Sequence, residues 1–130
     1  MAPLRVPDDL DGVTGRPDED VLGAVRSLGP LMVARSRGPL PIEVLTGTGR
    51  AEVPVPQVEV VDTLGAGDVL HGALSAWLAV RGTGDLMDGL AWAAHIAADS
   101  CTAPGSRGWL ADQQRLSLLR KSLSPDRRPA

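Results

Sequence analysis

The segment 58–79, VEVVDTLGAGDVLHGALSAWLA, contains glycines and two aspartates in an arrangement that suits a reactive or binding site. An apolar run at 58–61 leads into a loop with Gly65 and Gly67, and apolar residues at helical spacing follow. Glycine has no Cβ, so backbone amides at these positions can approach an anion closely, and the first amides of a helix have no partner within the helix. The order of strand, glycine loop and helix therefore predicts a site for a phosphate group.

Asp68 falls in the first turn of the expected helix, beside the predicted phosphate site. A carboxylate repels an anion, so a loop that only bound phosphate would gain nothing from it. Asp68 could accept a proton from a reacting hydroxyl, or it could compensate the helix dipole, a common role of Asp in a first turn that contributes about 0.3–1 kcal/mol. The spacing alone favours neither role.

The elements that must position this loop follow from the apolar pattern. Pro17, the acids after it and Gly29 delimit a short helix at 17–28. Short or alternating apolar runs, separated by prolines and a Gly-Thr-Gly turn, indicate strands, two of which form a hairpin. Helical spacing returns after Gly67, with Trp77 expected in the core. The expected strands are 31–36, 41–47, 51–56 and 58–61, and the expected later helices are 67–81, 85–103 and 112–123.

The composition bounds the class of protein. A chain of 130 residues with 43% hydrophobic residues fits one domain with one core. Its net charge of −3 argues against binding to the phosphate backbone of nucleic acid. Cys101 is the single cysteine, and with His71 and His95 it makes no convincing zinc set. No apolar segment is long enough to cross a bilayer, so we expect a cytoplasmic protein without nucleic-acid or membrane partners.

Seven residues resemble a family motif. The sequence DTLGAGD, from Asp62 to Asp68, is similar to the motif DTxGAGD near the C-terminus of the PfkB or ribokinase-type carbohydrate kinases. The helix and Pro-Gly loop of AHIAADSCTAPGSRG, 94–108, and the hairpin and approach strands before the motif also resemble that family. Leu64 stands where a Thr is frequent, at a position that contributes mainly backbone. The resemblance implies an α/β fold, the C-terminal part of a ribokinase-like three-layer arrangement.

The resemblance also implies a reaction, the transfer of the γ-phosphoryl group of ATP, with Mg²⁺, to a hydroxyl of a sugar, a nucleoside or a related small alcohol. Asp68 would be the base, and the amides of Gly65, Ala66 and Gly67 would form an anion hole around the transferring group. Asp62 would help to order the loop, beside a monovalent cation such as K⁺ as in some members. Capping of the loop is an equally good explanation of Asp62.

The resemblance places further residues beside the nucleotide. They belong to the hairpin turn, to the helix that borders adenine in the family, and to the Pro-Gly turn after it. Each has a simpler explanation: a tight turn for the hairpin glycines, a packed or surface position for the histidine, and a helix stop for the last turn. His71 is ambiguous in the same way. The expected nucleotide-binding residues are Thr46, Gly47, Gly49, Trp92, His95, Gly105 and Ser106.

The expected organisation is an irregular lead-in at 1–16, a partial kinase domain at 17–123 and a disordered tail at 124–130. Family members are more than twice as long, and the residues that grip the sugar would precede Met1, so we expect an incomplete chain with little activity alone. Two other classes stay open: a nucleotide-binding or regulatory module without catalysis, and a plain α/β interaction domain. Exposed sheet edges and apolar faces predict self-association, with a homodimer as one form.

Overall fold

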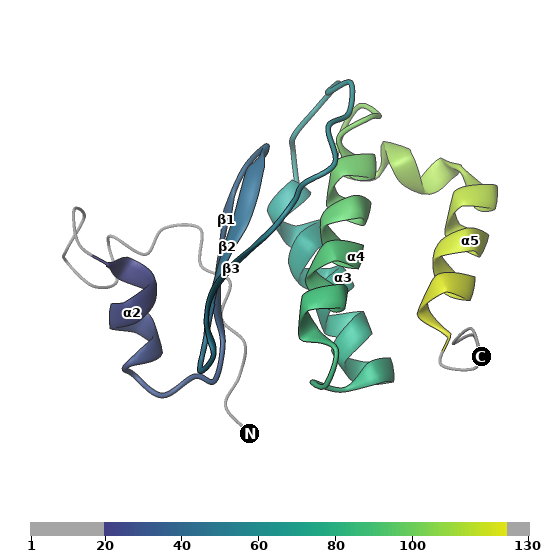
Figure 1. Cartoon of the computed structure of the whole chain (residues 1–130). Helices are drawn as coiled ribbons and strands as arrows, with labels where there is room; N and C mark the ends of the chain where they lie inside the picture. The colour runs from purple at the N-terminus through teal and green to yellow at the C-terminus, as the bar shows by residue number, and fades with distance from the viewer. Residues whose placement is uncertain (1–19, 125–130) are drawn as a thin grey trace. The chain divides into compact units, whose positions relative to one another are not determined.

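A computed structural model describes residues 20–124 of the chain. These residues fall into two compact units, one that ends at Val55 and one that begins at Pro56, and each is described by itself. The first unit contains one described helix and three strands, and the second contains helices (Figure 1). Within residues 20–124, no helix is both long enough and apolar enough to cross a membrane.

The first unit begins with a helix whose start is fixed by an aspartate. α2 (Val21–Arg26) follows Asp20, whose carboxylate accepts a hydrogen bond of 3.0 Å from the N–H of Gly23. Such a cap gives a partner to a helix amide that has none within the helix. The helix predicted at 17–28 is confirmed for 21–26, and its first three positions lie outside the described residues.

Three antiparallel strands follow in the order β1-β2-β3. They are β1 (Val33–Arg37), β2 (Leu40–Thr46) and β3 (Gly49–Val53). Gly49 has a φ of 125°, a backbone conformation that glycine adopts readily, and it pairs with Thr46 at the end of the β2–β3 hairpin. The strands predicted at 31–36, 41–47 and 51–56, and the hairpin with its Gly-Thr-Gly turn, are therefore confirmed to within a few residues.

Alternation along the strands sends successive side chains to opposite faces of this sheet. Val33 and Leu45 are paired across β1 and β2, and they pack against the apolar face of α2. Ile42 and Val44 point to the other face and are fully buried. The buried side chains of α2 in this cluster are Val21, Leu22 and Val25.

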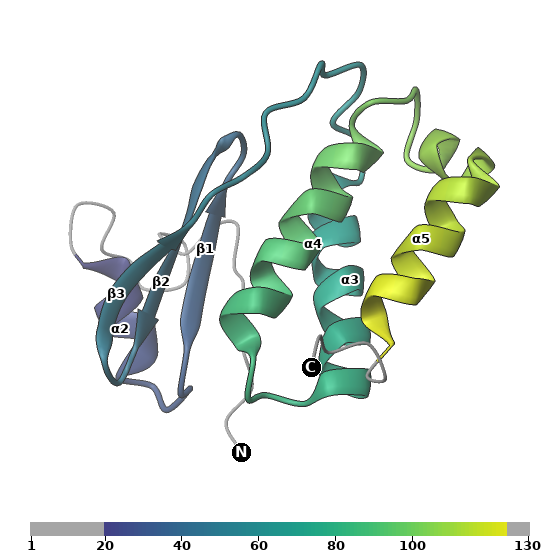
Figure 2. The same ribbon diagram turned by 45° about the vertical axis from the view of Figure 1, so that its right-hand side comes forward.

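The second unit is built on two long helices that lie side by side. α3 (Ala66–Arg81) and α4 (Leu86–Ser100) are joined by the short link 82–85 (Figure 2). They approach closely, because a Cβ placed on Gly89 would lie only 2.6 Å from Cδ1 of Trp77. The ring of Trp77 is buried against this glycine, and Trp77 is 6% exposed, so its prediction as a core residue is confirmed.

A short 3₁₀ helix and a last helix complete the unit. η1 (Gly108–Ala111) was not expected from the sequence, whereas α5 (Gln113–Leu123) agrees with the helix predicted at 112–123. The guanidinium of Arg81, at the end of α3, donates to three backbone oxygens at 122–124 over 3.1–3.3 Å. These are oxygens at the C-terminus of α5, where carbonyls have no partner within the helix. Arg81 therefore holds the end of α5 against α3.

The other two helices of this unit also follow the apolar pattern. α3 begins one residue before the predicted start and ends where predicted. α4 ends at Ser100 rather than at 103, because the amides of Cys101 and Thr102 bond to carbonyls three residues back. Such bonds tighten the last turn of a helix and end it.

One expected strand is absent. Residues 58–61 form no strand, although their apolar character predicted one. A strand requires a hydrogen-bonded neighbour, and the described part of the second unit offers none. The N–H groups of Val61 and Asp62 both bond instead to the carbonyl of Cys101, at 2.8 and 3.1 Å. Val60 and Val61 are each 58% exposed, so the prediction of a buried strand leading into the glycine loop is wrong.

Candidate functional site

The glycine loop is a tight turn built around Gly65. The N–H of Ala66 donates to the carbonyl of Thr63 at 3.1 Å, and Gly65 has φ 78° and ψ 6°. These are the dihedral angles of the third residue of a type II turn, a position that requires glycine or asparagine. Gly65 is also the N-cap residue of α3, and no side chain caps this helix. The turn therefore leads into α3 and leaves the first amides of the helix uncapped.

These first amides are the hydrogen-bond donors that the loop offers. Among the hydrogen bonds between residues 20–124, none uses the N–H of Gly65, Gly67 or Asp68. The N–H of Val69 donates to the carbonyl of Gly65 at 2.9 Å, which is the first regular bond of the helix. Because the positive end of the helix dipole lies at the same place, an anion at the start of α3 would meet both free donors and a favourable field.

Ala66 is not one of these donors, which corrects the anion hole expected from the sequence. Its N–H is already bonded to Thr63, because the turn that places glycine at Gly65 uses this amide to close. The N–H of Asp68, by contrast, is unengaged. The set of available donors is therefore Gly65, Gly67 and Asp68.

Asp62 ties this loop to a second one. Its Oδ1 accepts a hydrogen bond of 2.9 Å from the N–H of Leu64, and its Oδ2 accepts one of 2.9 Å from the N–H of Gly105. These donors, Leu64 first and then Gly105, stabilise the charged form and hold the pKa of the Asp62 carboxyl below its ordinary value. Both bonds are compatible with the loop-ordering role and with the capping of the loop, the two explanations that the sequence left open for Asp62.

The turn at 104–106 lies against the glycine loop. A Cβ placed on Gly65 would lie 3.0 Å from the Cβ of Ser106, so the two backbones approach as closely as glycine permits. The indole Nε1 of Trp109 donates to the carbonyl of Ser106 at 3.2 Å and supports the turn from its other side. Gly105 and Ser106 are thus beside the predicted phosphate site, and their contact with a nucleotide stays a prediction.

Asp68 is exposed in the first turn of α3. Its carboxylate takes part in no hydrogen bond or ion pair with another residue of the described range. A free carboxylate next to a row of unengaged N–H groups can accept a proton from a bound hydroxyl, and it can also compensate the helix dipole. The geometry is compatible with both roles that the sequence left open.

Two of the residues expected beside the nucleotide lie on α4, away from this loop. Trp92 donates through Nε1 to Oγ of Ser122 at 2.8 Å, and its ring centroid is 5.7 Å from that of Trp77. It precedes Cys101 by nine positions, which on a helix is about 13 Å along the axis. His95 is exposed on the same helix. The structure therefore gives Trp92 a packing role and does not bring it to the glycine loop.

The hairpin residues expected beside the nucleotide belong to the first unit. Thr46 Oγ1 accepts a hydrogen bond of 3.2 Å from the N–H of Thr48, and Gly47 and Gly49 complete the tight turn between β2 and β3. The turn by itself accounts for these glycines. Contact of Thr46, Gly47 and Gly49 with ATP stays a prediction.

Two parts of the site were not predicted. The carbonyl of Cys101 anchors the chain just before the loop, and Trp109 supports the turn at 104–106. The role of the Cys101 carbonyl could not be recognised from the sequence, because every residue has a backbone carbonyl. The position of Trp109 gave one signal, since a large apolar residue within the polar stretch GSRGWLADQQ is expected to pack against something.

Comparison with protein families identifies the class of protein. A glycine loop that leads into the start of a helix is a common site for phosphate groups. Residues 8–112, most of the chain, match the model of the pfkB family of carbohydrate kinases. The chain belongs to the pfkB carbohydrate kinase family, which confirms the resemblance drawn from the motif at 62–68.

Solved structures agree on the fold. The aminoimidazole riboside kinase of Salmonella enterica is 29% identical with a TM-score of 0.72, over 88% of this chain and 39% of that chain. A fructokinase of Vibrio cholerae O395 is 26% identical with a TM-score of 0.69, over 85% of this chain and 37% of that one. A ribokinase of Thermotoga maritima, 23% identical with a TM-score of 0.69 over 86% and 38%, has the same fold. The α/β fold of ribokinase type is confirmed, and the chain spans about two fifths of the length of these structures.

Proposed function

We propose that this chain carries the phosphoryl-transfer loop of a kinase that moves the γ-phosphoryl group of ATP to a hydroxyl of a sugar or related small alcohol. The observation that supports this most is the arrangement at the start of α3, where unengaged N–H groups adjoin the unengaged carboxylate of Asp68. The donors suit the charge of a transferring phosphoryl group, and the carboxylate suits the proton that the acceptor must lose. Family membership agrees with this reaction.

In the proposed reaction, the acceptor hydroxyl oxygen attacks the γ-phosphorus and Asp68 accepts the hydroxyl proton. As the new P–O bond forms, the bond from the γ-phosphorus to the bridging oxygen breaks, and the electron pair leaves with ADP. The N–H groups of Gly65, Gly67 and Asp68 donate to the oxygens of the transferring group. Because the transition state is loose, the proton leaves late and a weak base is sufficient.

The second loop has a supporting role in this proposal. Asp62 holds Gly105 beside the glycine loop, so the two backbones form one rim around the phosphates. Gly105 and Ser106 then border the nucleotide. Preorganised donors need no rearrangement as charge develops, which is the main way a phosphoryl-transfer site accelerates its reaction.

The donor groups of the chain determine which metal ions fit. Within residues 20–124, no three His, Cys, Asp or Glu side chains gather at one place. Asp62 already accepts two N–H bonds, and Asp68 is the other carboxylate of the loop. This set fits a Mg²⁺ ion held chiefly by ATP phosphates and water, whose charge would neutralise the phosphates. A K⁺ ion would fit beside the remaining lone pairs of Asp62.

We propose a sugar or nucleoside as the acceptor and the cytoplasm as the setting, without nucleic-acid or membrane partners. Structures similar to this chain include a kinase complexed with aminoimidazole riboside and an ATP analogue, and a fructokinase in a form bound to fructose and ADP. The described loops contact phosphate and hydroxyl in this proposal, and they do not choose between acceptors.

A second candidate is a nucleotide-binding module without turnover. It is favoured by the described loops, which offer N–H donors for phosphates and no group that selects an acceptor. The two candidates agree on nucleotide binding and differ on phosphoryl transfer.

Two measurements test these candidates in turn. Calorimetry with Mg²⁺ and ATP should detect weak binding, and no binding at millimolar nucleotide would count against both. A turnover assay over a panel of sugars and nucleosides then separates them. If transfer is seen, Asp68→Asn should lower its rate by about 10²- to 10⁴-fold, the usual contribution of a positioned base.

A matched control separates the role of base from dipole compensation. Asp88 is also an exposed carboxylate in a first helical turn, that of α4. Asp88→Asn removes the same dipole compensation and should leave the rate unchanged. If Asp68→Asn retains the full rate, the assignment of the base is wrong.

A further inference from the structure

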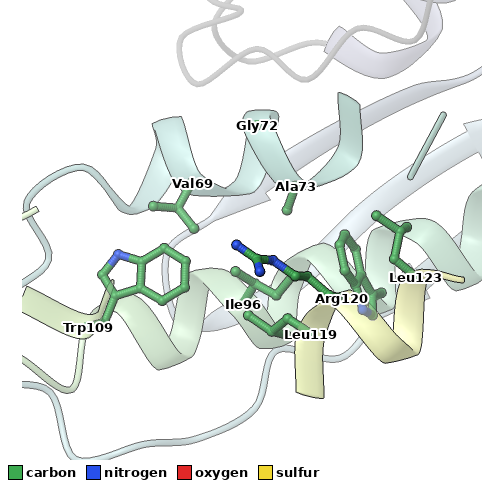
Figure 3. A pocket seen from close by; sticks show the side chains of 9 residues that line it. Val69, Gly72, Ala73, Ile96, Trp109, Leu119, Arg120 and Leu123 are labelled. Atoms are coloured by element: carbon green, nitrogen blue, oxygen red, sulfur yellow. The ribbon is translucent and has the colours of Figure 1, made fainter. Parts of the chain in front are cut away.

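A cavity lies between α5 and the pair formed by α3 and α4 (Figure 3). Its volume is about 320 Å³, and it is open to solvent. All four helices of the second unit contribute to it, with Val69 and Gly72 from α3, Trp92 from α4, Trp109 from η1 and Arg120 from α5. A concave, largely apolar space of this size is typical of sites for small organic molecules.

One cation lines this apolar space, and its residue, Arg120, is exposed to solvent. Figure 3 shows the side chain of Arg120 reaching from α5 into the space between the labelled side chains. Among residues 20–124, no ion pair or hydrogen bond involves its guanidinium. The guanidinium of Arg81, at the end of α3, donates instead to backbone oxygens at the end of α5 and lies 4.7 Å from the centroid of the Trp77 ring. Arg120 is therefore available to an external anion.

The two properties of the cavity specify the chemistry of an occupant. A planar guanidinium fork matches the two oxygens of a carboxylate, and such charge-assisted pairs are stronger than neutral ones. The indoles of Trp92 and Trp109 and the aliphatic lining favour a flat apolar body. A neutral apolar molecule would gain no charge-assisted bond from Arg120, and a small inorganic anion would leave the apolar lining uncovered.

We propose that this cavity binds a small aromatic carboxylate, with the carboxylate on Arg120 and the ring system between α3 and the two tryptophans. The proposal goes beyond the phosphoryl-transfer function, because no residue of the loops 62–68 and 104–106 lines the cavity. An occupant would contact α3, the helix that begins at the glycine loop, together with η1 and α5. It should therefore raise the melting temperature of the chain.

Ligand binding at this site can be followed through the tryptophan side chains. It has three tryptophans, of which Trp92 and Trp109 line the cavity and Trp77 does not. In a ¹⁵N spectrum of the full chain, titration with sodium 2-naphthoate should shift the indole signals of Trp92 and Trp109 more than that of Trp77. 2-Naphthamide, a neutral molecule of nearly the same shape, should bind about tenfold more weakly, because it lacks the charged partner for Arg120.

Three variants locate the site. Arg120→Gln should bring the affinity for naphthoate down to that for naphthamide. Lys121→Gln removes the same charge from the next residue of α5, which does not line the cavity, and should leave the affinity unchanged. Gly72→Leu should weaken both ligands, because the space at its Cβ is open and the added side chain would occupy the cavity.

Each of these outcomes can overturn the proposal. Equal affinity for naphthoate and naphthamide, or unchanged naphthoate binding in a folded Arg120→Gln variant, would remove the role of the cation. Retained affinity in Gly72→Leu would place the ligand elsewhere. Displacement of naphthoate by ATP would show one shared site and overturn the assignment of a separate one, whereas ATP binding without displacement leaves the proposal and the phosphoryl-transfer function independently supported.

Discussion

At the scale of single residues, the site depends on a position that excludes a side chain for two separate reasons. Gly65 has a φ of 78°, which is strained for any residue with a Cβ, and such a Cβ would lie 3.0 Å from that of Ser106. The first constraint forms the turn that leads into α3. The second brings the two loops of the candidate site together.

We therefore expect Gly65→Ala to lower the stability of the chain by about 1–2 kcal/mol, the cost of a left-handed conformation for a residue with a Cβ. It should also weaken ATP binding at least tenfold in calorimetry, because the turn can no longer present its amides. Gly84→Ala is the control, since the space at its Cβ is open. Adding Ser106→Gly relieves the contact but not the strain, so it should restore only part of the loss. Full restoration would show that the turn geometry is unimportant.

The lowered pKa of Asp62 predicts that the stability of the chain depends on pH. The N–H groups of Leu64 and Gly105 lower its pKa from the ordinary value of 3.8, so folding favours the charged carboxylate. Stability from this group is complete above the unfolded pKa and is lost as the pH falls through the folded one. Asp62→Asn, which retains only one acceptor oxygen, should melt below the wild type at neutral pH.

The difference between these two proteins should shrink as the pH falls from 3.8 through the lower pKa of the folded state, because the wild-type carboxyl group then becomes neutral, as the amide of the variant already is. Melting curves measured across this range test the prediction. Asp88→Asn, at an exposed carboxylate, provides the baseline. A gap that stays constant down to the lowest pH would show that the charge of Asp62 is not what ties the two loops.

At the scale of elements, the second unit depends on the contact of α3 with α4. Gly89 permits this contact, because a Cβ there would lie 2.6–2.9 Å from three atoms of the Trp77 ring. Trp77 is buried between its neighbours and cannot move aside without opening the core. The position of α3, and with it the direction of its first amides, follows from this packing.

Two glycine substitutions should accordingly have opposite effects. Gly89→Ala should destabilise the chain by about 1–3 kcal/mol, the usual cost of overpacking a core. Gly72→Ala, in the middle of α3 with open space at its Cβ, should stabilise it by about 0.5–1 kcal/mol, because alanine is the better helix former. Urea denaturation measures both. Stabilisation by Gly89→Ala would mean that the helices lie farther apart than the structure places them.

The elements differ in how far the sequence determines them. The spacing of Leu70, Leu74 and Trp77 predicted α3 because a single buried stripe suffices to specify a helix, and alternation with a glycine turn predicted the hairpin. The strand predicted at 58–61 is absent, because strand formation depends on a neighbouring strand that the local apolar pattern does not reveal. The sequence did not predict η1, because short 3₁₀ segments have no apolar periodicity.

The candidate site was predictable to a similar degree. A glycine loop before a helix indicated where the free amides lie, and this part follows from sequence order alone. The engagement of Ala66 by Thr63 was not predictable, because it depends on the type of turn that Gly65 adopts. The bond from Gly105 to Asp62 spans 43 residues, and no local pattern of the sequence indicates it.

At the scale of the whole molecule, the described residues leave large apolar side chains and strand edges exposed. β1 and β3 each have an unpaired edge in the three-stranded sheet. Exposed edges and contiguous apolar surface favour association between copies of a chain. The large hydrophobic residues that are 38–67% exposed are Leu28, Leu31, Leu40, Val60, Val61, Leu64, Val80, Leu110 and Leu118.

We expect the isolated chain to self-associate as its concentration rises. Light scattering should report an average mass that increases with concentration, from dimers to larger species. A single mass equal to that of the monomer over the whole range, together with one cooperative melting transition, would contradict this prediction. Leu40→Lys, at an exposed position of β2, should reduce the association if the sheet takes part in it.

The central claim is that the start of α3 receives the phosphates of a nucleotide through unengaged backbone amides. It is tested most directly by a titration of the ¹⁵N-labelled chain with ATP and Mg²⁺, followed at each backbone N–H. We expect the signals of Gly65, Gly67 and Asp68 to shift most, and the signal of Ala66, whose N–H is bonded to Thr63, to shift less. Saturable shifts confined to other parts of the chain, or no shifts at millimolar nucleotide, would contradict it.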